Sequence, residues 1–84
     1  MNEKTEKIGY RKRYKETLKQ TIRLLKEKKK QTKSADNQQS IEQKLKELSK
    51  ELKSFNKVYD SRTLDAEFVY RIHGLEKLIK KYSQ

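Results

Sequence analysis

The 84-residue chain contains no cysteine, no proline and no tryptophan, and only two glycines and one histidine. Without cysteine, the chain has no disulfides, thiolate metal sites or cysteine nucleophiles. Because proline is absent and glycine is rare, nothing in the sequence interrupts long helices. No constellation of nucleophile, base or metal ligands stands out, so we expect a protein that is not an enzyme and needs no metal or cofactor.

Long apolar segments are missing as well. No apolar run approaches the roughly 20 residues of a membrane-spanning helix, and no apolar signal-peptide segment lies near the N-terminus. Apolar residues make up 31% of the chain and charged residues 42%. We therefore expect a single small domain over residues 1–84, not secreted, with a thin core and marginal stability.

The positive charge is concentrated at one end of the chain. The formal net charge is +11, and residues 1–33 hold 13 of the 23 Lys and Arg residues but only 4 of the 12 Asp and Glu residues. Residues 34–60 carry equal numbers of both signs. A surface that only has to stay soluble does not need this asymmetry, whereas an arm that binds a polyanion does. The charge distribution therefore favours a nucleic acid as the partner.

Apolar residues recur at spacings of three and four in three segments, which is the period of an amphipathic helix. The first stripe consists of Tyr14, Leu18, Ile22 and Leu25. The second consists of Ile41, Leu45, Leu48, Leu52, Phe55 and Val58. The third consists of Leu64, Phe68, Ile72, Leu75, Ile79 and Tyr82, widened by Val69 and Leu78. The stripes predict three helices, over about residues 5–33, 40–59 and 63–82.

Turn and capping residues separate these segments. Ser40 begins a Ser-x-x-Gln capping box for the second helix. Asp60, Ser61 and Thr63 are candidate N-caps for the third helix. Both connections are short, so consecutive helices are expected to run antiparallel. The predicted fold is all-α, an antiparallel three-helix bundle with a long basic first helix.

A second architecture fits the same spacings. Apolar residues three and four apart also suit an antiparallel coiled coil that completes its core with another copy or another protein. A thin core favours such a partner. Periodicity alone does not choose between the two arrangements.

A basic stripe runs beside the apolar stripe of the first predicted helix. At about 100° of rotation per residue, six cations share one sector: Lys12, Lys15, Lys19, Arg23, Lys26 and Lys30. This stripe is roughly 27 Å long, enough to follow the phosphates along one groove. Arg11 and Arg13 add guanidinium forks suited to a phosphate or a guanine edge, and Tyr10 and Tyr14 can stack on a base. We predict that these eight cations bind nucleic acid.

The segment RKRYKETLKQTI at residues 11–22 combines a basic pair, a following lysine, a later lysine and an isoleucine. In the third predicted helix, Ala66 is followed five residues later by Arg71 and Ile72. Both patterns resemble the bacterial-type small-subunit ribosomal protein S-twenty family, here in an organellar or divergent form. The resemblance implies a three-helix bundle whose long basic first helix penetrates the small-subunit rRNA.

Residues 61–70 depart from the pattern of that family. The family has a His-Lys-Asn entry and a basic cluster at the start of its third helix, whereas this chain has SRTLD followed by EFVY after Ala66. The resemblance therefore implies rRNA contacts for the first helix, at positions such as Arg13, Lys15 and Lys19, and carries none over to the third.

The basic stripe predicts an RNA-binding structural protein, and the resemblance implies a small-subunit ribosomal protein on ribosomes of the cytoplasm or an organellar matrix. The alternative is a small helical interaction or regulatory module, of a kind found in phages and plasmids, that completes a bundle or coiled coil with a partner protein. In that case the apolar faces supply the binding energy and the lysines only keep the chain in solution. A DNA-binding helix-turn-helix ranks third, because its recognition helix would be the nearly neutral third segment.

Overall fold

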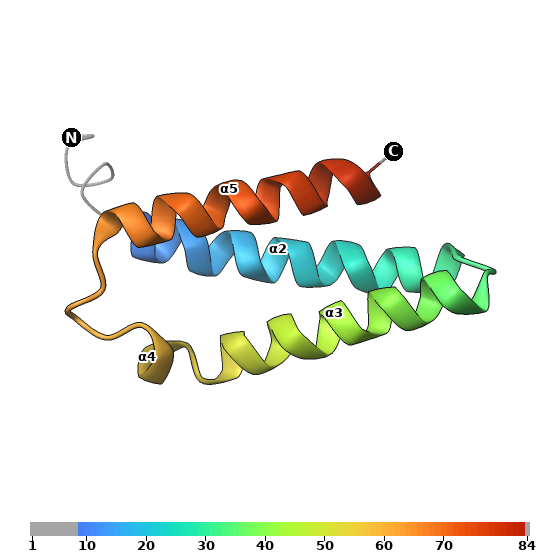
Figure 1. The fold of residues 1–84 in the computed structure, drawn as a ribbon, viewed down its shortest axis with the longest axis horizontal. Helices are drawn as coiled ribbons and strands as arrows, with labels where there is room; N and C mark the ends of the chain where they lie inside the picture. Colours follow the sequence, from blue (N-terminus) through green and yellow to red (C-terminus); the bar gives the residue numbers. More distant parts are fainter. Residues whose placement is uncertain (1–8, 84) are drawn as a thin grey trace.

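The computed structural model describes residues 9–83, which form helices joined by short connections and contain no strand. The elements are α2 (Gly9–Gln31), α3 (Ala35–Lys53), the single turn α4 (Phe55–Val58) and α5 (Asp65–Tyr82). In Figure 1, α2 and α5 run in the same direction and α3 runs against both. The predicted all-α bundle with antiparallel consecutive helices is confirmed.

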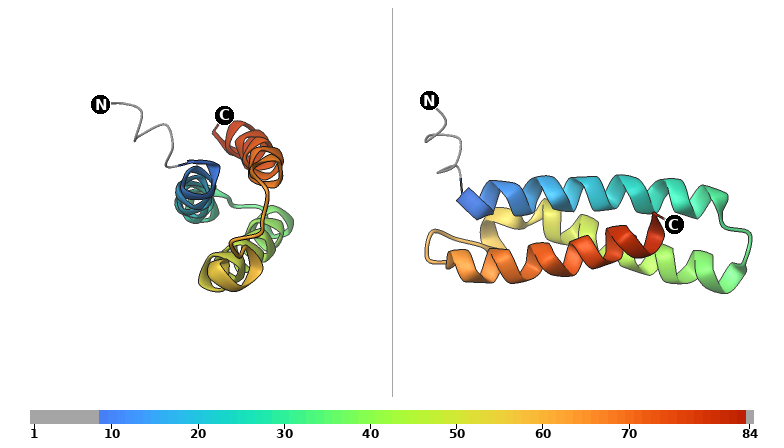
Figure 2. Two further views of the ribbon diagram at one scale, coloured as in Figure 1. Left: turned by 90° about the vertical axis from the view of Figure 1, so that its left-hand side faces the viewer. Right: turned by 90° about the horizontal axis from the view of Figure 1, so that it is seen from above.

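The central element of the bundle is α2. It packs against α3 and against α5, and these are the two extensive helix contacts among the described residues. The left view of Figure 2 looks nearly along the helix axes and shows α3 and α5 on two different sides of α2. The face of α2 that points between its neighbours is buried: Tyr14, Leu18, Thr21, Ile22 and Leu25. The opposite face of α2 is therefore left to solvent.

The apolar stripes form the core as predicted, except at the connection between α4 and α5. All four residues of the first stripe are buried, and three residues of each of the other two are buried as well: Ile41, Leu48, Phe55, Phe68, Ile72 and Leu75. Four further apolar residues are partly buried against this core: Leu45, Leu52, Leu78 and Tyr82. Val58 and Leu64 are instead exposed, by 53% and 73%. Both lie beside the connection, where the helical period stops and an apolar residue no longer returns to the buried face. Their assignment to the core was wrong.

The first helix agrees with the prediction in its central part. Residues 5–8 of the predicted helix lie outside the described residues. The helix begins at Gly9, whose φ of 82° is outside the right-handed helical region and is accessible to glycine without strain. It ends at Gln31, slightly before the predicted residue 33.

The second helix begins at Ala35 rather than at residue 40. Ser34 is its N-cap, and the Ser34 hydroxyl accepts a hydrogen bond from the Asn37 backbone N–H at 3.4 Å. The Gln38 side chain donates to the Thr32 carbonyl at 2.6 Å, so it closes the turn from α2. The predicted capping box was wrong, because Ser40 lies inside α3.

The second helix was predicted to continue to residue 59, but it breaks at Ser54. The Ser54 backbone has φ −106° and ψ 28°, and its hydroxyl donates to the Lys50 carbonyl at 2.9 Å. The chain then forms α4, in which Phe55 is buried and Val58 is not. Apolar spacing could not reveal this break, because Phe55 continues the stripe of α3 without a gap.

The third helix begins at Asp65, with Leu64 in the N-cap position and no side-chain hydrogen bond to the cap. The predicted N-caps Asp60, Ser61 and Thr63 lie in the preceding connection, so that prediction was wrong. Asp65 itself lies in the first turn of α5. Its negative charge there interacts favourably with the positive end of the helix dipole.

Four aromatic rings form a cluster at the α4 end of the bundle. Tyr14, Phe55, Tyr59 and Phe68 lie with ring centroids 5.0 to 6.4 Å apart. Each is exposed by 3% or less. Aromatic pairs attract one another at such separations, and these four side chains come from α2, α4, the residue after α4, and α5. The cluster therefore joins the ends of all these elements.

A carboxylate on α3 completes this cluster. The hydroxyls of Tyr14 and Tyr59 both donate to Oε2 of Glu51, the latter at 2.6 Å. Burial, together with the hydrogen bonds to this carboxylate, raises the pKa of both phenols. Because Tyr14 is buried and bonded in this way, it cannot stack on a base as predicted.

A matched pair of leucine truncations tests the core. Leu18 is fully buried and Leu64 is 73% exposed. Leu18→Ala leaves a cavity and is expected to lower the free energy of unfolding by about 2–5 kcal/mol. Leu64→Ala is expected to change it by less than about 0.5 kcal/mol. Urea denaturation followed by circular dichroism measures both, and equal losses would contradict the assigned core.

Alkaline pH tests the tyrosine–carboxylate cluster. The two phenols have folded-state pKa values above the ordinary 10.0, so their stabilising contribution is present below pH 10 and is lost as the pH rises further. The free energy of unfolding is expected to fall above pH 10, and to fall less steeply in Tyr14→Phe, which retains only one such phenol. Urea denaturation at several pH values measures this, and identical slopes for the two proteins would contradict it.

Candidate nucleic-acid interface

The predicted basic stripe lies on the outer face of α2, on the side toward α3 and α4. The Lys15 ammonium lies 5.6 Å from the centroid of the Phe55 ring in α4. Lys29, which is not part of the stripe but precedes its last residue, pairs with Glu42 of α3 at 3.0 Å. Lys15 is half-buried, and the other five stripe residues are exposed: Lys12, Lys19, Arg23, Lys26 and Lys30. The structure thus keeps these six cations on one continuous strip of surface.

The fold does little to neutralise this strip. Among the described residues, Lys19 is the one member with an ion pair, 3.8 Å from Glu16. Both side chains of that pair are about half exposed, at 46% and 59%, and such surface pairs contribute little to stability. A row of like charges without counter-charges repels itself. An external polyanion would relieve that repulsion.

Two hollows adjoin Lys15 where α2 passes α4. One is lined by Arg11, Lys12, Lys15, Glu16, Lys19, Phe55 and Asn56. The other is lined by Lys15, Leu52, Lys53, Ser54, Phe55, Asn56 and Lys57. Three residues line both hollows, so we treat them together as the basic trough. One acidic residue, Glu16, stands among six basic ones on its walls.

Lys53 and Lys57 were missed by the sequence prediction. Both are exposed, and neither has an ion pair within the described residues. Residues 34–60 are neutral overall, so their lysines did not stand out. The break at Ser54 brings these two side chains beside Lys15. No local signal could have found them, because Lys53 ends α3 and Lys57 lies in α4, on opposite sides of the break.

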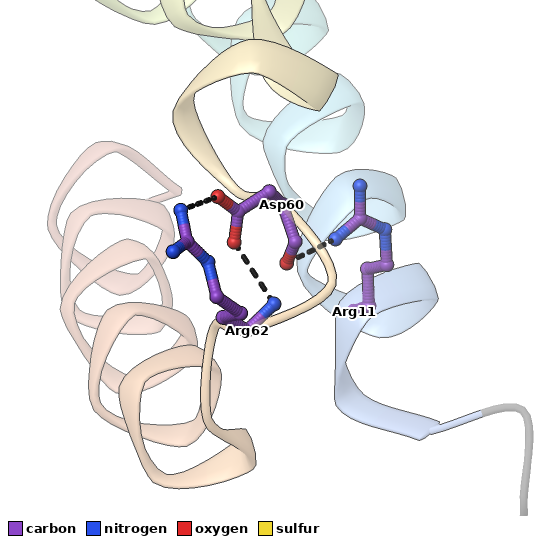
Figure 3. Close-up of polar contacts among 3 residues, drawn as sticks. All are labelled: Arg11, Asp60 and Arg62. Carbon is purple, nitrogen blue, oxygen red and sulfur yellow. Dashed lines mark hydrogen bonds and ion pairs between the residues drawn. The ribbon is translucent and has the colours of Figure 1, made fainter.

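The donors of Arg11 are used inside the fold. Its guanidinium donates to Asn56 Oδ1 at 3.1 Å and to the Asp60 carbonyl at 3.3 Å, and lies 5.3 Å from the Phe55 ring centroid. Figure 3 shows the second of these bonds beside the contacts of Asp60 with Arg62. Arg11 therefore fastens α2 to the connection that follows α4.

Asp60 is itself held in a fixed position. Its carboxylate accepts hydrogen bonds from the Arg62 guanidinium at 3.0 Å and from the Arg62 backbone N–H at 2.9 Å. These hydrogen bonds lower the pKa of Asp60. The Asp60 carbonyl is thereby oriented toward Arg11, as seen in Figure 3.

Arg13 lies apart from the stripe. At 100° per residue it is roughly 80° around α2 from the nearest stripe residue. Its guanidinium lies 5.6 Å from the ring centroid of Tyr10, which is 38% exposed. Of the eight predicted cations, the structure thus places six in the stripe, Arg11 at its edge in a structural position, and Arg13 on a different sector.

Other kinds of site find no support in this part of the chain. Residues 9–83 contain no group of three or more His, Asp or Glu side chains that could hold a metal ion. No helix within the same range is long and apolar enough to cross a membrane.

Comparison with known proteins gives no family for the chain. No protein-family model, no curated protein and no solved structure matches it. The resemblance to small-subunit ribosomal proteins therefore rests on the residues of the sequence, and the candidate interface rests on the geometry described above.

Two neighbouring substitutions separate the structural cation from a stripe cation. Arg11→Gln and Lys12→Gln each remove one positive charge. Arg11→Gln also removes hydrogen bonds to α4 and the connection after it, and is expected to lower the free energy of unfolding by about 1 kcal/mol. Lys12→Gln is expected to change it by less than about 0.5 kcal/mol. Urea denaturation compares them, and equal stability of the two variants would show that the Arg11 contacts contribute nothing.

Proposed function

We propose that this protein is an RNA-binding structural protein, which lays the basic stripe and the basic trough against the phosphate backbone of a folded RNA. The main support for this proposal is the continuous row of six cations on α2. Five of them have no ion pair among the described residues. Lys53 and Lys57 widen this row where α2 meets α4. The finer proposal is that the RNA is small-subunit rRNA, as the sequence resemblance implies.

The chemistry of the stripe suits backbone binding. Five of its six members are lysines, which are flexible point charges that approach phosphates without reading bases. Each phosphate that is neutralised releases condensed counterions, so the affinity depends steeply on salt. Over a length of roughly 27 Å, such a stripe contacts several phosphates in succession. The expected role is to hold a folded RNA in shape rather than to recognise a sequence.

RNA is preferred over DNA for a physical reason. Sequence-specific DNA binding places bidentate side chains against base edges in the major groove, and the stripe offers one arginine for that purpose. Double-stranded RNA is recognised largely by shape and by phosphate contacts, which a lysine row can supply. On a ribosome, this role would place the protein in the cytoplasm or an organellar matrix.

The other helices are proposed to orient α2. The aromatic cluster and Glu51 fix α2 against α4 and α5, and Lys15 is held over Phe55. A cation that is held in place loses less conformational freedom when it binds. The alternative function, completing a bundle with a partner protein, has less support, because eleven core residues are already buried to 7% exposure or less within one chain.

A salt titration with matched charge variants tests the proposal. Binding to a structured small-subunit rRNA fragment and to duplex DNA of similar length is measured at matched ionic strengths. The wild type is expected to prefer the RNA, with log affinity falling linearly against log salt. Lys12→Gln with Lys26→Gln should reduce the slope by about 2. Lys77→Gln with Lys80→Gln, which removes the same charge from exposed positions of α5, should leave the slope nearly unchanged.

Three results would contradict the proposal. Equal losses in the two double variants would show that only the net charge matters. Preference for the DNA would overturn the choice of RNA. Weak binding to both nucleic acids that disappears by physiological salt would mean that the stripe is a solvated surface.

A further inference from the structure

Three exposed apolar side chains gather at one place on the surface. Four large hydrophobic residues are exposed among the described residues, and three of them, Val58, Leu64 and Tyr70, line a single hollow at the connection between α4 and α5. Their exposed fractions are 53%, 73% and 79%. The remaining lining residues are Tyr59, Thr63, Ala66, Glu67 and Arg71. We refer to this feature as the Tyr70 hollow.

The Tyr70 hollow is not explained by folding. Tyr70 makes no ring contact with any other described aromatic residue, although the four neighbouring rings form a cluster. Exposing apolar side chains to water costs free energy, and a group of exposed apolar side chains rimmed by polar residues is typical of a binding surface. The ring of Tyr70 is therefore open to a ligand.

The basic trough and the Tyr70 hollow are both lined in part by residues of α4. In the single turn of α4, Asn56 and Lys57 line the trough, and the next residue, Val58, lines the hollow. Arg62, with a side chain 89% exposed, lies in the connection between α4 and α5. An RNA whose phosphates lie in the trough and that continues past α4 would reach the hollow that Tyr70 lines.

We propose that the Tyr70 hollow binds an unpaired base of the RNA whose backbone lies in the basic trough. This inference rests on the proposed function. Proteins recognise unpaired RNA bases by stacking them on aromatic rings and guanidinium planes. Tyr70 supplies the stacking ring, and Leu64 and Val58 supply apolar contacts for the edge and face of the base. The ligand is thus an RNA helix interrupted by a bulged or looped nucleotide.

A base suits the hollow better than a protein does. A stable protein interface engages about 20 or more residues on each side, whereas the apolar part of the hollow consists of three side chains. The net charge of +11 and the adjoining lysines of the trough favour an anionic ligand. A nucleotide combines both requirements, a flat apolar base and a phosphate.

A fluorescent bulge tests the inference. Two hairpin RNAs are compared, one with a single unpaired 2-aminopurine in the stem and one with that base paired. Wild type is expected to bind the bulged RNA about tenfold more tightly and to quench its fluorescence by stacking. Tyr70→Ala should lose both the preference and the quenching while binding the paired RNA as wild type does. Tyr70→Phe, which keeps the ring, should retain both.

The outcomes separate this inference from the proposed function. If Tyr70→Ala and wild type bind both RNAs alike, with the salt slope of the stripe intact, the base site is wrong and backbone binding stands. If Lys12→Gln with Lys26→Gln leaves binding of both RNAs unchanged, the proposed function is wrong and this inference with it. If wild type forms a dimer in sedimentation that Tyr70→Ala abolishes, the hollow is a protein contact and the base site is overturned.

Discussion

The partly buried carboxylate of Glu51, which accepts hydrogen bonds from two tyrosine hydroxyls, is the constraint on which the rest of the structure depends. From the last turn of α3, it links this helix to Tyr14 of α2 and to Tyr59, the residue after α4. A carboxylate that loses part of its hydration is costly unless its oxygens are hydrogen-bonded. The two phenols supply these hydrogen bonds. An ionised phenol would have no proton to donate and would repel the carboxylate. A chain with so few apolar residues thus gains a fixed end for its bundle.

The same constraint produces the proposed interface. Because the cluster brings Phe55 against α2, Lys15 lies over its ring and Arg11 reaches Asn56 and the connection beyond. The break at Ser54 then carries lysines of α3 and α4 to the edge of the stripe. The packing of the apolar face of α2 therefore determines where the cations on its outer face lie. The core and the proposed interface are formed by two faces of the same helix.

Sequence periodicity predicted the three helices, the buried stripe of α2 and the six-cation stripe, because each depends only on the helical period. It could not predict the break at Ser54, since Phe55 continues the apolar spacing, nor the burial of Thr21, whose hydroxyl is satisfied by the Thr17 carbonyl at 2.7 Å. The structural use of Arg11 and the recruitment of Lys53 depend on residues far away in the sequence. Such tertiary arrangements leave no local signal.

The central claim is that an RNA backbone binds along the outer face of α2 and the adjoining trough. Amide NMR of the labelled chain, titrated with a hairpin RNA at low salt, tests it most directly. The expected shifts follow one face of α2 between Lys12 and Lys30 and continue at Lys53 and Lys57, and they disappear as salt is raised. Shifts centred on the outer face of α5, or spread evenly over all helices, would contradict the claim.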